Sequence, residues 1–120
     1  MDLMSAVKTV LNNYANFNDR SGKGEFWWWT LAYFIGYAVL VFVGGVLNLG
    51  TILAGVFGLA LLVPNIAVSV RRFHDIGKSG WWVLIFLIPL INIIAVIYFF
   101  VIVDSDGPNQ YGEGPLPPAA

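Results

Sequence analysis

The hydrophobic positions of this chain fall into three long runs that are separated by short polar segments. Residues 26–47, 51–70 and 81–103 contain no Asp, Glu, Lys or Arg. At 1.5 Å per residue, each run would form a helix of about 30 Å or more, which matches the hydrocarbon thickness of a bilayer. The pattern therefore predicts an all-α integral membrane helical bundle with three transmembrane helices.

Residues 1–16 show a different pattern, because apolar and polar positions recur there with the period of a helix. Leu3, Val7 and Val10 lie on one side of that helix, and Lys8 lies on the other. This pattern is typical of an amphipathic helix lying in the membrane interface. The alternative is an ordinary amphipathic helix that packs against the rest of the protein.

The third run, residues 81–103, differs from the other two because Pro89 and Asn92 interrupt it. Our preferred interpretation is one transmembrane helix that is kinked at Pro89, so that the chain leaves on the side opposite its start. The alternative is a re-entrant hairpin that turns at Pro89. Its arms of 8 and about 14 residues would be shorter than the ~20 residues needed to cross a bilayer.

Two prolines and two asparagines interrupt the second and third runs. Pro64 is expected to kink the second run, because proline lacks the N–H that a helix needs. An unpaired amide inside a membrane is costly, so Asn65 and Asn92 are expected to have partners. These partners are either each other or the backbone groups that Pro64 and Pro89 leave free.

Composition and charge support a single membrane domain over residues 1–120. The chain is 58% hydrophobic and 11% charged, whereas soluble domains carry about 25% charged residues. Three of the six Lys and Arg residues precede the first run and three lie between the second and third runs. The positive-inside rule then places the N-terminus in the cytoplasm and, with three spans, the Gly- and Pro-rich tail (104–120) outside.

Aromatic residues cluster where these runs begin and end. All five tryptophans flank the polar segments and are predicted to lie at the cytoplasmic headgroup level: Trp27, Trp28, Trp29, Trp81 and Trp82. Trp27, Trp28, Trp81 and Trp82 are the predicted interfacial anchors. With three spans, residues 98–100 would approach the opposite interface.

The densest polar cluster is Arg71, Arg72, His74, Asp75 and Lys78, between the second and third runs. In one interpretation these basic residues set the orientation and contact anionic lipid. In the other, Arg71 or Arg72 pairs with Asp75 or with Glu25 and holds a phosphate or carboxylate site. A carboxylate can also orient an imidazole for proton transfer, which directs attention to His74 beside Asp75.

Other kinds of chemistry find no support in the sequence. One histidine, scattered carboxylates and no cysteine give no recognisable metal-ligand spacing, so we expect no metal and no cofactor. No motif defines a reaction, so we assign no catalytic residue. The absence of a basic excess argues against a nucleic-acid partner.

Several motifs resemble those of a known family. They are RRFHDIGKSGWW (71–82), IPLI (88–91), GPNQYGEGP (107–115), and Phe17, Arg20, Glu25, Phe26 and Trp27 near the N-terminus. With these motifs the chain resembles the small bacterial inner-membrane proteins grouped as domain of unknown function 805, or the YhaH family. The resemblance implies a bacterial inner (cytoplasmic) membrane protein with a multi-span helical fold, and it implies no activity.

The chain departs from the family pattern at four positions. Asp19 replaces a usual Gly, Lys23 an Arg, Gly24 a common Lys, and Gln110 stands where the tail often has Arg. These changes lower the positive charge and weaken the case for an anion site. If the family motifs around Arg20, Arg71 and Asn109 form one site, however, the tail is cytoplasmic and the re-entrant hairpin is favoured.

The candidate residues for binding an anion, a lipid or a partner are Arg20, Glu25, Arg71, Arg72, His74, Asp75, Lys78, Asn109 and Tyr111. The leading hypothesis is a non-enzymatic scaffold or accessory subunit that binds anionic membrane lipid or a membrane partner, including a second copy of the chain. It would do so through an interfacial loop at Arg71–Lys78. The alternative is a subunit of an enzyme or transporter that handles an anionic substrate at the cytoplasmic interface, which requires Glu25 to meet that loop.

Overall fold

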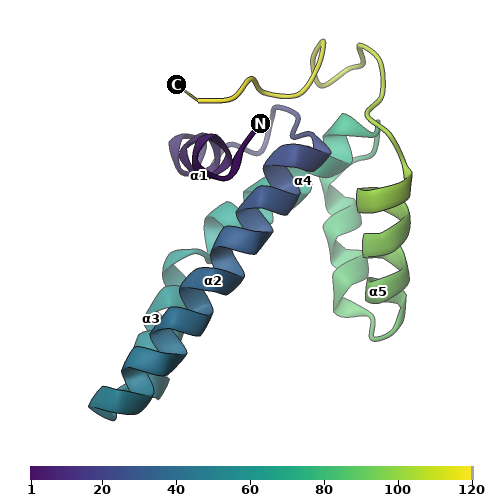
Figure 1. Cartoon of the computed structure of the whole chain (residues 1–120). Coiled ribbons are helices and arrows are strands. Elements are labelled where there is room, and N and C mark those ends of the chain that lie inside the picture. The colour runs from purple at the N-terminus through teal and green to yellow at the C-terminus, as the bar shows by residue number, and fades with distance from the viewer. Residues whose placement is uncertain (120) are drawn as a thin grey trace.

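The computed structural model describes residues 1–119 and has an all-α fold. In chain order the elements are α1 (Leu3–Asn12), α2 (Lys23–Leu47), α3 (Gly50–Ala60), α4 (Leu62–Asp75), the 3₁₀ helix η1 (Gly80–Leu87), α5 (Ile91–Ala95) and the π-helical η2 (Val96–Ile102). Figure 1 shows two hairpins, α2 with α3 and η1 with α5, that diverge from a common end. We call this end the head and define it as residues 1–25, 71–79 and 103–119.

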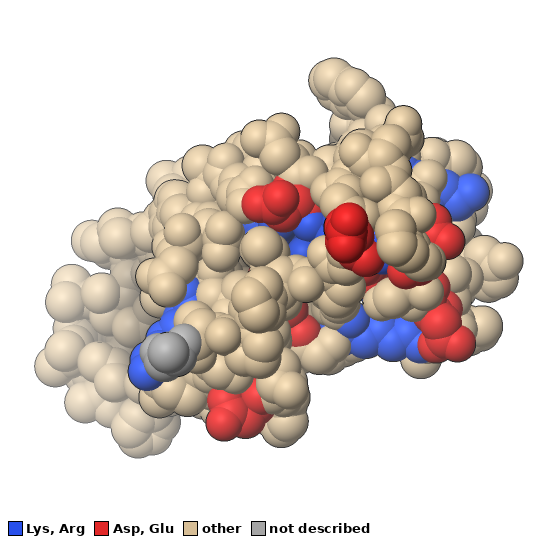
Figure 2. All heavy atoms as spheres, turned by 90° about the horizontal axis from the view of Figure 1, so that it is seen from above, with Lys and Arg blue, Asp and Glu red and all other residues tan. Residues whose placement is uncertain are grey.

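The head carries all six Lys and Arg residues and all seven Asp and Glu residues. Figure 2 shows the molecule from above, with the charged residues coloured. The hairpins outside the head expose large apolar side chains instead, such as Phe42, Leu59 and Leu87. By length and apolar composition, α2 is able to cross a membrane, and the bent pair α3 and α4 is also able to do so if it counts as one span. The predicted all-α fold is confirmed, and its apolar helices are consistent with membrane spans.

The helix predicted within residues 1–16 is present as α1. The Asp2 carboxylate accepts a hydrogen bond from the Ser5 backbone N–H at 2.8 Å and forms a capping box with Ser5, which satisfies N–H groups that the first turn leaves free. Val10 is buried against the bundle, whereas Leu11 is exposed on the outer side. The helix therefore packs on the protein and also presents apolar side chains outward; its position in a membrane interface remains a prediction.

The second run is divided into α3 and α4, which meet at Leu61 with a bend of 41°. Pro64 has no N–H to donate to the Ala60 carbonyl four residues earlier. The Tyr14 hydroxyl donates to this free carbonyl instead. The predicted kink at Pro64 is thus confirmed, and its acceptor is satisfied from the segment that follows α1.

The end of the second run differs from the prediction. Residues 71–75 were expected in an interfacial loop, but they form the last turns of α4, which ends at Asp75. The helix continues because these residues are buried at the head and Arg72 pairs with Asp75 three residues later. Only residues 76–79 remain as a connection to η1.

The third run is a hairpin, so the preferred prediction of one kinked span over residues 81–103 is wrong. The eight residues of η1 rise about 16 Å, and the twelve residues of α5 and η2 rise about 18 Å, so neither arm alone is long enough to cross a bilayer. The chain turns at Pro89 and Leu90, where Leu90 has a φ of 69°. The Asn92 amide donates to the Phe86 carbonyl at 3.3 Å, an acceptor that Pro89 leaves free, as expected.

The hairpin returns the chain to the head, where the tail lies beside α1 (Figure 1). The backbone N–H of Asp106 donates to the Asp75 carbonyl at 2.8 Å, and that of Leu116 donates to the Arg20 carbonyl at 2.9 Å. The expectation that the tail leaves on the side opposite the N-terminus is therefore wrong. The structure instead has the alternative hairpin that turns at Pro89, and it places Arg20 beside the tail motif.

The structure also bears on the predicted places of aromatic residues. Residues 98–100 were placed near the opposite interface, but Phe100 is fully buried near the head, with its ring 4.4 Å from that of Phe26. Trp29, predicted at headgroup level with the other tryptophans, is buried in the core beside Val10 of α1, and its indole N–H donates to the Asn65 side chain at 2.7 Å. Asn65 thus finds its partner on α2 rather than on Asn92.

Candidate functional site: a buried arginine clamp

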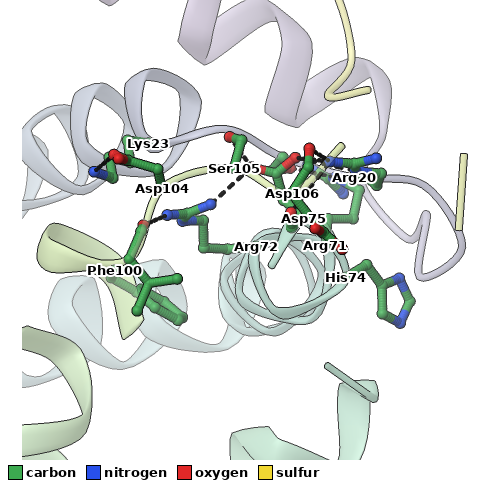
Figure 3. Close-up of polar contacts among 12 residues, drawn as sticks. Arg20, Lys23, Arg71, Arg72, His74, Asp75, Phe100, Asp104, Ser105 and Asp106 are labelled. Carbon is green, nitrogen blue, oxygen red and sulfur yellow. Dashed lines mark hydrogen bonds and ion pairs between the residues drawn. The ribbon is translucent and has the colours of Figure 1, made fainter. Parts of the chain in front are cut away.

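Five charged side chains are buried together in the head, each with at most 1% of its surface exposed. They are Arg20, Glu25, Arg71, Arg72 and Asp75, and we call this set the arginine clamp. Burying a charge costs several kcal/mol unless it is paired and hydrogen-bonded. Figure 3 shows how the polar groups converge at the end of α4.

Asp75 lies at the centre of the clamp and binds two arginines. Its Oδ1 is 3.0 Å from Arg20 Nη2, and its Oδ2 is 2.7 Å from Arg72 Nη1. The Ser105 hydroxyl donates to the same Oδ2. Because Arg20, Asp75 and Ser105 come from three distant segments, a single carboxylate ties the loop, α4 and the tail together.

Arg20 uses its remaining donors on backbone carbonyl oxygens. It donates to the carbonyls of Asp75 at 3.1 Å, Asp106 at 2.7 Å, Gly107 at 2.9 Å and Gly112 at 3.0 Å. The planar guanidinium presents five N–H donors in a fixed fork, so one side chain can hold several carbonyls in place. Arg20 therefore fixes the path of the tail across the head.

Arg71 fixes the loop that follows α1. Its Nη2 is 2.6 Å from Glu25 Oε2, and its Nε donates to the Ser21 hydroxyl at 2.8 Å. Its Nη1 donates to the carbonyls of Asn13 at 3.0 Å and Asn16 at 2.9 Å. The convergence of Glu25 with the Arg71 segment, which the enzyme or transporter hypothesis required, is therefore present.

Arg72 joins the clamp to the returning arm of the hairpin, where it donates to the Val103 carbonyl at 2.8 Å. The three guanidinium groups face two carboxylates, so the clamp has one positive charge in excess, which backbone carbonyl dipoles surround. Two buried atoms, Arg72 Nε and Glu25 Oε1, have no hydrogen-bond partner among the described residues. All other guanidinium nitrogens of the clamp bind internal acceptors.

Three further candidate residues flank the clamp. The rings of His74 and Tyr111 are stacked with centroids 3.8 Å apart, and the Asn109 amide donates to the His74 carbonyl at 3.1 Å. The His74 imidazole points away from the clamp in Figure 3, and its Nδ1 lies 3.1 Å from the Asp19 carbonyl oxygen. The hypothesis that Asp75 orients the imidazole is therefore wrong, because Asp75 binds the arginines.

Lys78 stands apart from the clamp, with its ammonium 5.3 Å from the centre of the Trp82 ring. The four predicted anchors are all exposed, and Trp81 is the most exposed at 78%. Trp27 and Trp28 lie on the first turns of α2, whereas Trp81 and Trp82 open η1. The structure thus brings the candidate residues to one end of the molecule and leaves Lys78 at its rim.

The tail supplies functional groups that sequence reasoning missed. The carbonyls of residues 106, 107 and 112 bind Arg20, and backbone carbonyls leave no trace in a sequence. Asp104 was also missed; its carboxylate is 2.7 Å from Lys23 Nζ. The Lys23 hydrogen bond and positive charge lower the pKa of Asp104 below its ordinary value.

The sequence matches a protein family and several named relatives. Residues 14–113 match the family described as "Protein of unknown function (DUF805)". The chain is similar to two proteins of Escherichia coli (strain K12): Inner membrane protein YhaI, 34% identical over 108 residues (89% of this chain and 92% of YhaI), and Inner membrane protein YhaH, 34% identical over 111 residues (88% and 92%). Uncharacterized protein YiiR of the same strain is 39% identical over 124 residues (82% and 84%). No solved structure matches the chain.

Proposed function

The chain belongs to the DUF805 family, and from this premise we propose that it is a non-enzymatic scaffold or accessory subunit of the bacterial inner membrane. In this proposal α2 and the bent pair α3–α4 cross the bilayer, and the hairpin of η1 and α5 re-enters it. The head is cytoplasmic, because all six Lys and Arg residues lie there. The N-terminus and the tail are then on the same side.

The observation that carries the proposal is that almost every guanidinium nitrogen of the arginine clamp binds an acceptor of the chain itself; among the described residues only Arg72 Nε does not. Arg20, Arg71 and Arg72 are fully buried, and they bind carboxylates and carbonyls of the chain itself. Such a network favours a structural role, because a bound anion would have to displace several charge-assisted hydrogen bonds. The clamp makes the head a fixed platform for a lipid surface or for another membrane protein.

Contact with anionic lipid is assigned to the rim of the head rather than to the clamp. Within the Arg71–Lys78 segment, Lys78 is the cation that lies at the surface, beside the exposed rings of Trp81 and Trp82. A lysine near an anionic leaflet contributes about 1 kcal/mol to membrane binding. Tryptophan rings lie at headgroup level in membrane proteins, which places Lys78 near lipid phosphates.

The test replaces Lys78 and measures how much phosphatidylglycerol the purified protein retains in native mass spectrometry. Lys78→Gln is expected to lower retention roughly fivefold, the equivalent of about 1 kcal/mol. Lys78→Arg should retain the lipid, and Glu113→Gln, a change in charge at the exposed tail, should not lower retention. Unchanged retention in Lys78→Gln would contradict the assignment of lipid binding to this rim.

A second candidate function is a subunit of an enzyme or transporter that handles an anionic substrate. It is supported by the 2.6 Å contact between Glu25 and Arg71, which brings a carboxylate and guanidinium groups to one place. It requires the clamp to open, and withdrawal of the tail would release the Arg20 donors. A chain truncated after residue 103 that binds inorganic phosphate in calorimetry, while the full chain does not, would favour this function.

A further inference from the structure

A cleft of about 520 Å³ lies beside the arginine clamp, between the loop after α1, the outer face of α4 and the start of η1. Polar side chains of Asn18, His74, Ser79 and Tyr111 line it together with the apolar side chains of Phe17, Ile66, Val70, Trp81 and Val83. Ile66 lies eight residues before His74 on α4, about 12 Å further from the head. The polar groups of the cleft therefore lie at the head, beside the ring of Phe17, and the lining is apolar where the hairpins begin.

His74 places an unused nitrogen in this cleft. The side chain is 6% exposed, and its Nδ1 lies 3.1 Å from the Asp19 carbonyl oxygen. A carbonyl oxygen only accepts hydrogen bonds, so Nδ1 carries a proton, and in the neutral ring Nε2 is an acceptor. No group among residues 1–119 forms a hydrogen bond with Nε2.

The direction of Nε2 follows from its neighbour Gly80. A Cβ atom built at Gly80 would lie 3.5 Å from His74 Nε2, and both Gly80 and His74 line the cleft. Stacking on Tyr111 and the contact with Asp19 fix the plane of the ring. The imidazole is thus a fixed acceptor at the polar end of an otherwise apolar cleft.

We propose that this cleft binds a phospholipid whose headgroup carries N–H donors, of the ethanolamine class. Its ammonium donates to His74 Nε2, and one acyl chain lies along Ile66, Val70 and Val83. The site is separate from Lys78, and it rests on the proposed function only in needing the head at a membrane surface. An amphipathic ligand fits because the lining changes from polar to apolar along the membrane normal, and Trp81 at the rim is 78% exposed.

The first test observes His74 directly, since it is the single histidine of the chain. Protein labelled with ¹⁵N-histidine is placed in nanodiscs of phosphatidylcholine, and phosphatidylethanolamine with the same acyl chains is added. The Nε2 resonance is expected to move with phosphatidylethanolamine and not with phosphatidylcholine, whose headgroup has no N–H. The proposal would be overturned if the Nε2 resonance does not move when phosphatidylethanolamine is added, or if the spectrum shows that Nε2 rather than Nδ1 is protonated.

The second test measures lipid preference by native mass spectrometry from an equal mixture of phosphatidylethanolamine and phosphatidylcholine. The loss of one hydrogen bond to a charged donor predicts that His74→Phe, which keeps the ring stack, reduces the preference for phosphatidylethanolamine roughly tenfold. Val83→Trp, which fills the cleft, should reduce the retention of phosphatidylethanolamine. Leu84→Trp is the matched control, because Leu84 lines a different hollow.

These variants separate the two proposals. If His74→Phe does not fold, Val83→Trp against Leu84→Trp still tests the cleft, and equal retention in that pair would refute it. Phosphatidylglycerol is measured in the same samples, and its retention should depend on Lys78 and not on Val83. If Lys78→Gln retains phosphatidylglycerol while Val83→Trp still loses phosphatidylethanolamine, only the rim assignment is refuted. If Val83→Trp retains phosphatidylethanolamine while Lys78→Gln still loses phosphatidylglycerol, only the cleft is refuted.

Discussion

The two ends of α2 are held to the rest of the molecule by opposite means. At the head, the Glu25 carboxylate is buried against Arg71 at 2.6 Å. At the far end, Gly44 meets Gly50 so closely that a Cβ on Gly44 would lie 2.5 Å from the Gly50 Cα. Between α2 and α3, Asn48 closes the turn in the left-handed conformation, with a φ of 61°.

In the proposed topology, where α2 and α3 cross the bilayer, the solvent explains this difference in the kind of contact. Between apolar helices in lipid there is no hydrophobic drive, so association depends on close packing, which small residues permit. At the head, loops and a tail without regular structure leave many backbone carbonyls, and the guanidinium groups of Arg20, Arg71 and Arg72 bind them. The head is held together by charged side chains, and the far end by the close approach of two glycines.

The largest expected effect is that of Asp75→Asn in the clamp. The change leaves Arg20 and Arg72 buried without their shared carboxylate, which is expected to destabilise the fold by about 3–5 kcal/mol. Unfolding by SDS in mixed micelles measures the difference. Asp104→Asn removes an exposed carboxylate and should change stability by less than about 0.5 kcal/mol; equal effects of the two changes would contradict the structural role of the clamp.

The next effect tests the far end with two neighbouring glycines. Gly44→Ala places a methyl group against the Gly50 backbone, and such overpacking costs about 1–3 kcal/mol. A Cβ at Gly45 would meet nothing within 4 Å, so Gly45→Ala should stabilise the helix by roughly 0.5–1 kcal/mol. Opposite signs in the same unfolding assay are expected; a neutral Gly44→Ala would show that the hairpin is not held by backbone contact.

A smaller effect tests the bend between these two regions. Tyr14→Phe leaves the Ala60 carbonyl without its donor, at an expected cost of about 1 kcal/mol. In a Pro64→Ala background the restored N–H of residue 64 can donate to that carbonyl, so the cost should shrink. A double-mutant cycle measures this coupling, and strict additivity of the two changes would refute the link between Pro64 and Tyr14.

The smallest effect concerns the exposed pair of Lys23 and Asp104, which contrasts with the buried pairs of the clamp. Because Lys23 lowers the pKa of Asp104, the pair stabilises the fold above the ordinary pKa of an aspartate. That stabilisation is lost as the pH falls through the lower folded value. NMR titration of Asp104 should show its pKa rising towards the ordinary value in Lys23→Gln, with little change in overall stability; an unchanged pKa would contradict the pairing.

Much of the helical architecture can be predicted from the sequence, because charge-free runs and helical periodicity mark α1, α2 and the α3–α4 pair. The course of residues 81–103 cannot, since an apolar run looks the same whether it crosses a membrane or turns back. The return is fixed by hydrogen bonds from Arg20 and Arg72 to backbone carbonyls of residues 103–112. The one indication of this return was that the family motifs around Arg20 and Asn109 could form a single site, which requires the tail to lie near the N-terminal segment.

The candidate site shows a similar division. The residue types and motifs identified the side chains that gather at the head, including Arg20, Arg71 and Asp75. They did not show that these side chains are fully buried and bonded to one another, because burial depends on where the tail lies. The role assigned to them therefore moved from contact with lipid to stabilisation of the head.

We propose that both termini lie on one side of the membrane and the turn between α2 and α3 on the other. The chain has no cysteine, so Asn12→Cys, Leu49→Cys and Glu113→Cys can each be labelled in spheroplasts with a membrane-impermeant maleimide. We predict that Leu49→Cys is labelled in intact spheroplasts, whereas Asn12→Cys and Glu113→Cys are labelled only after lysis. Labelling of Glu113→Cys in intact spheroplasts, with Asn12→Cys protected, would contradict the re-entrant hairpin and the clamp that depends on it.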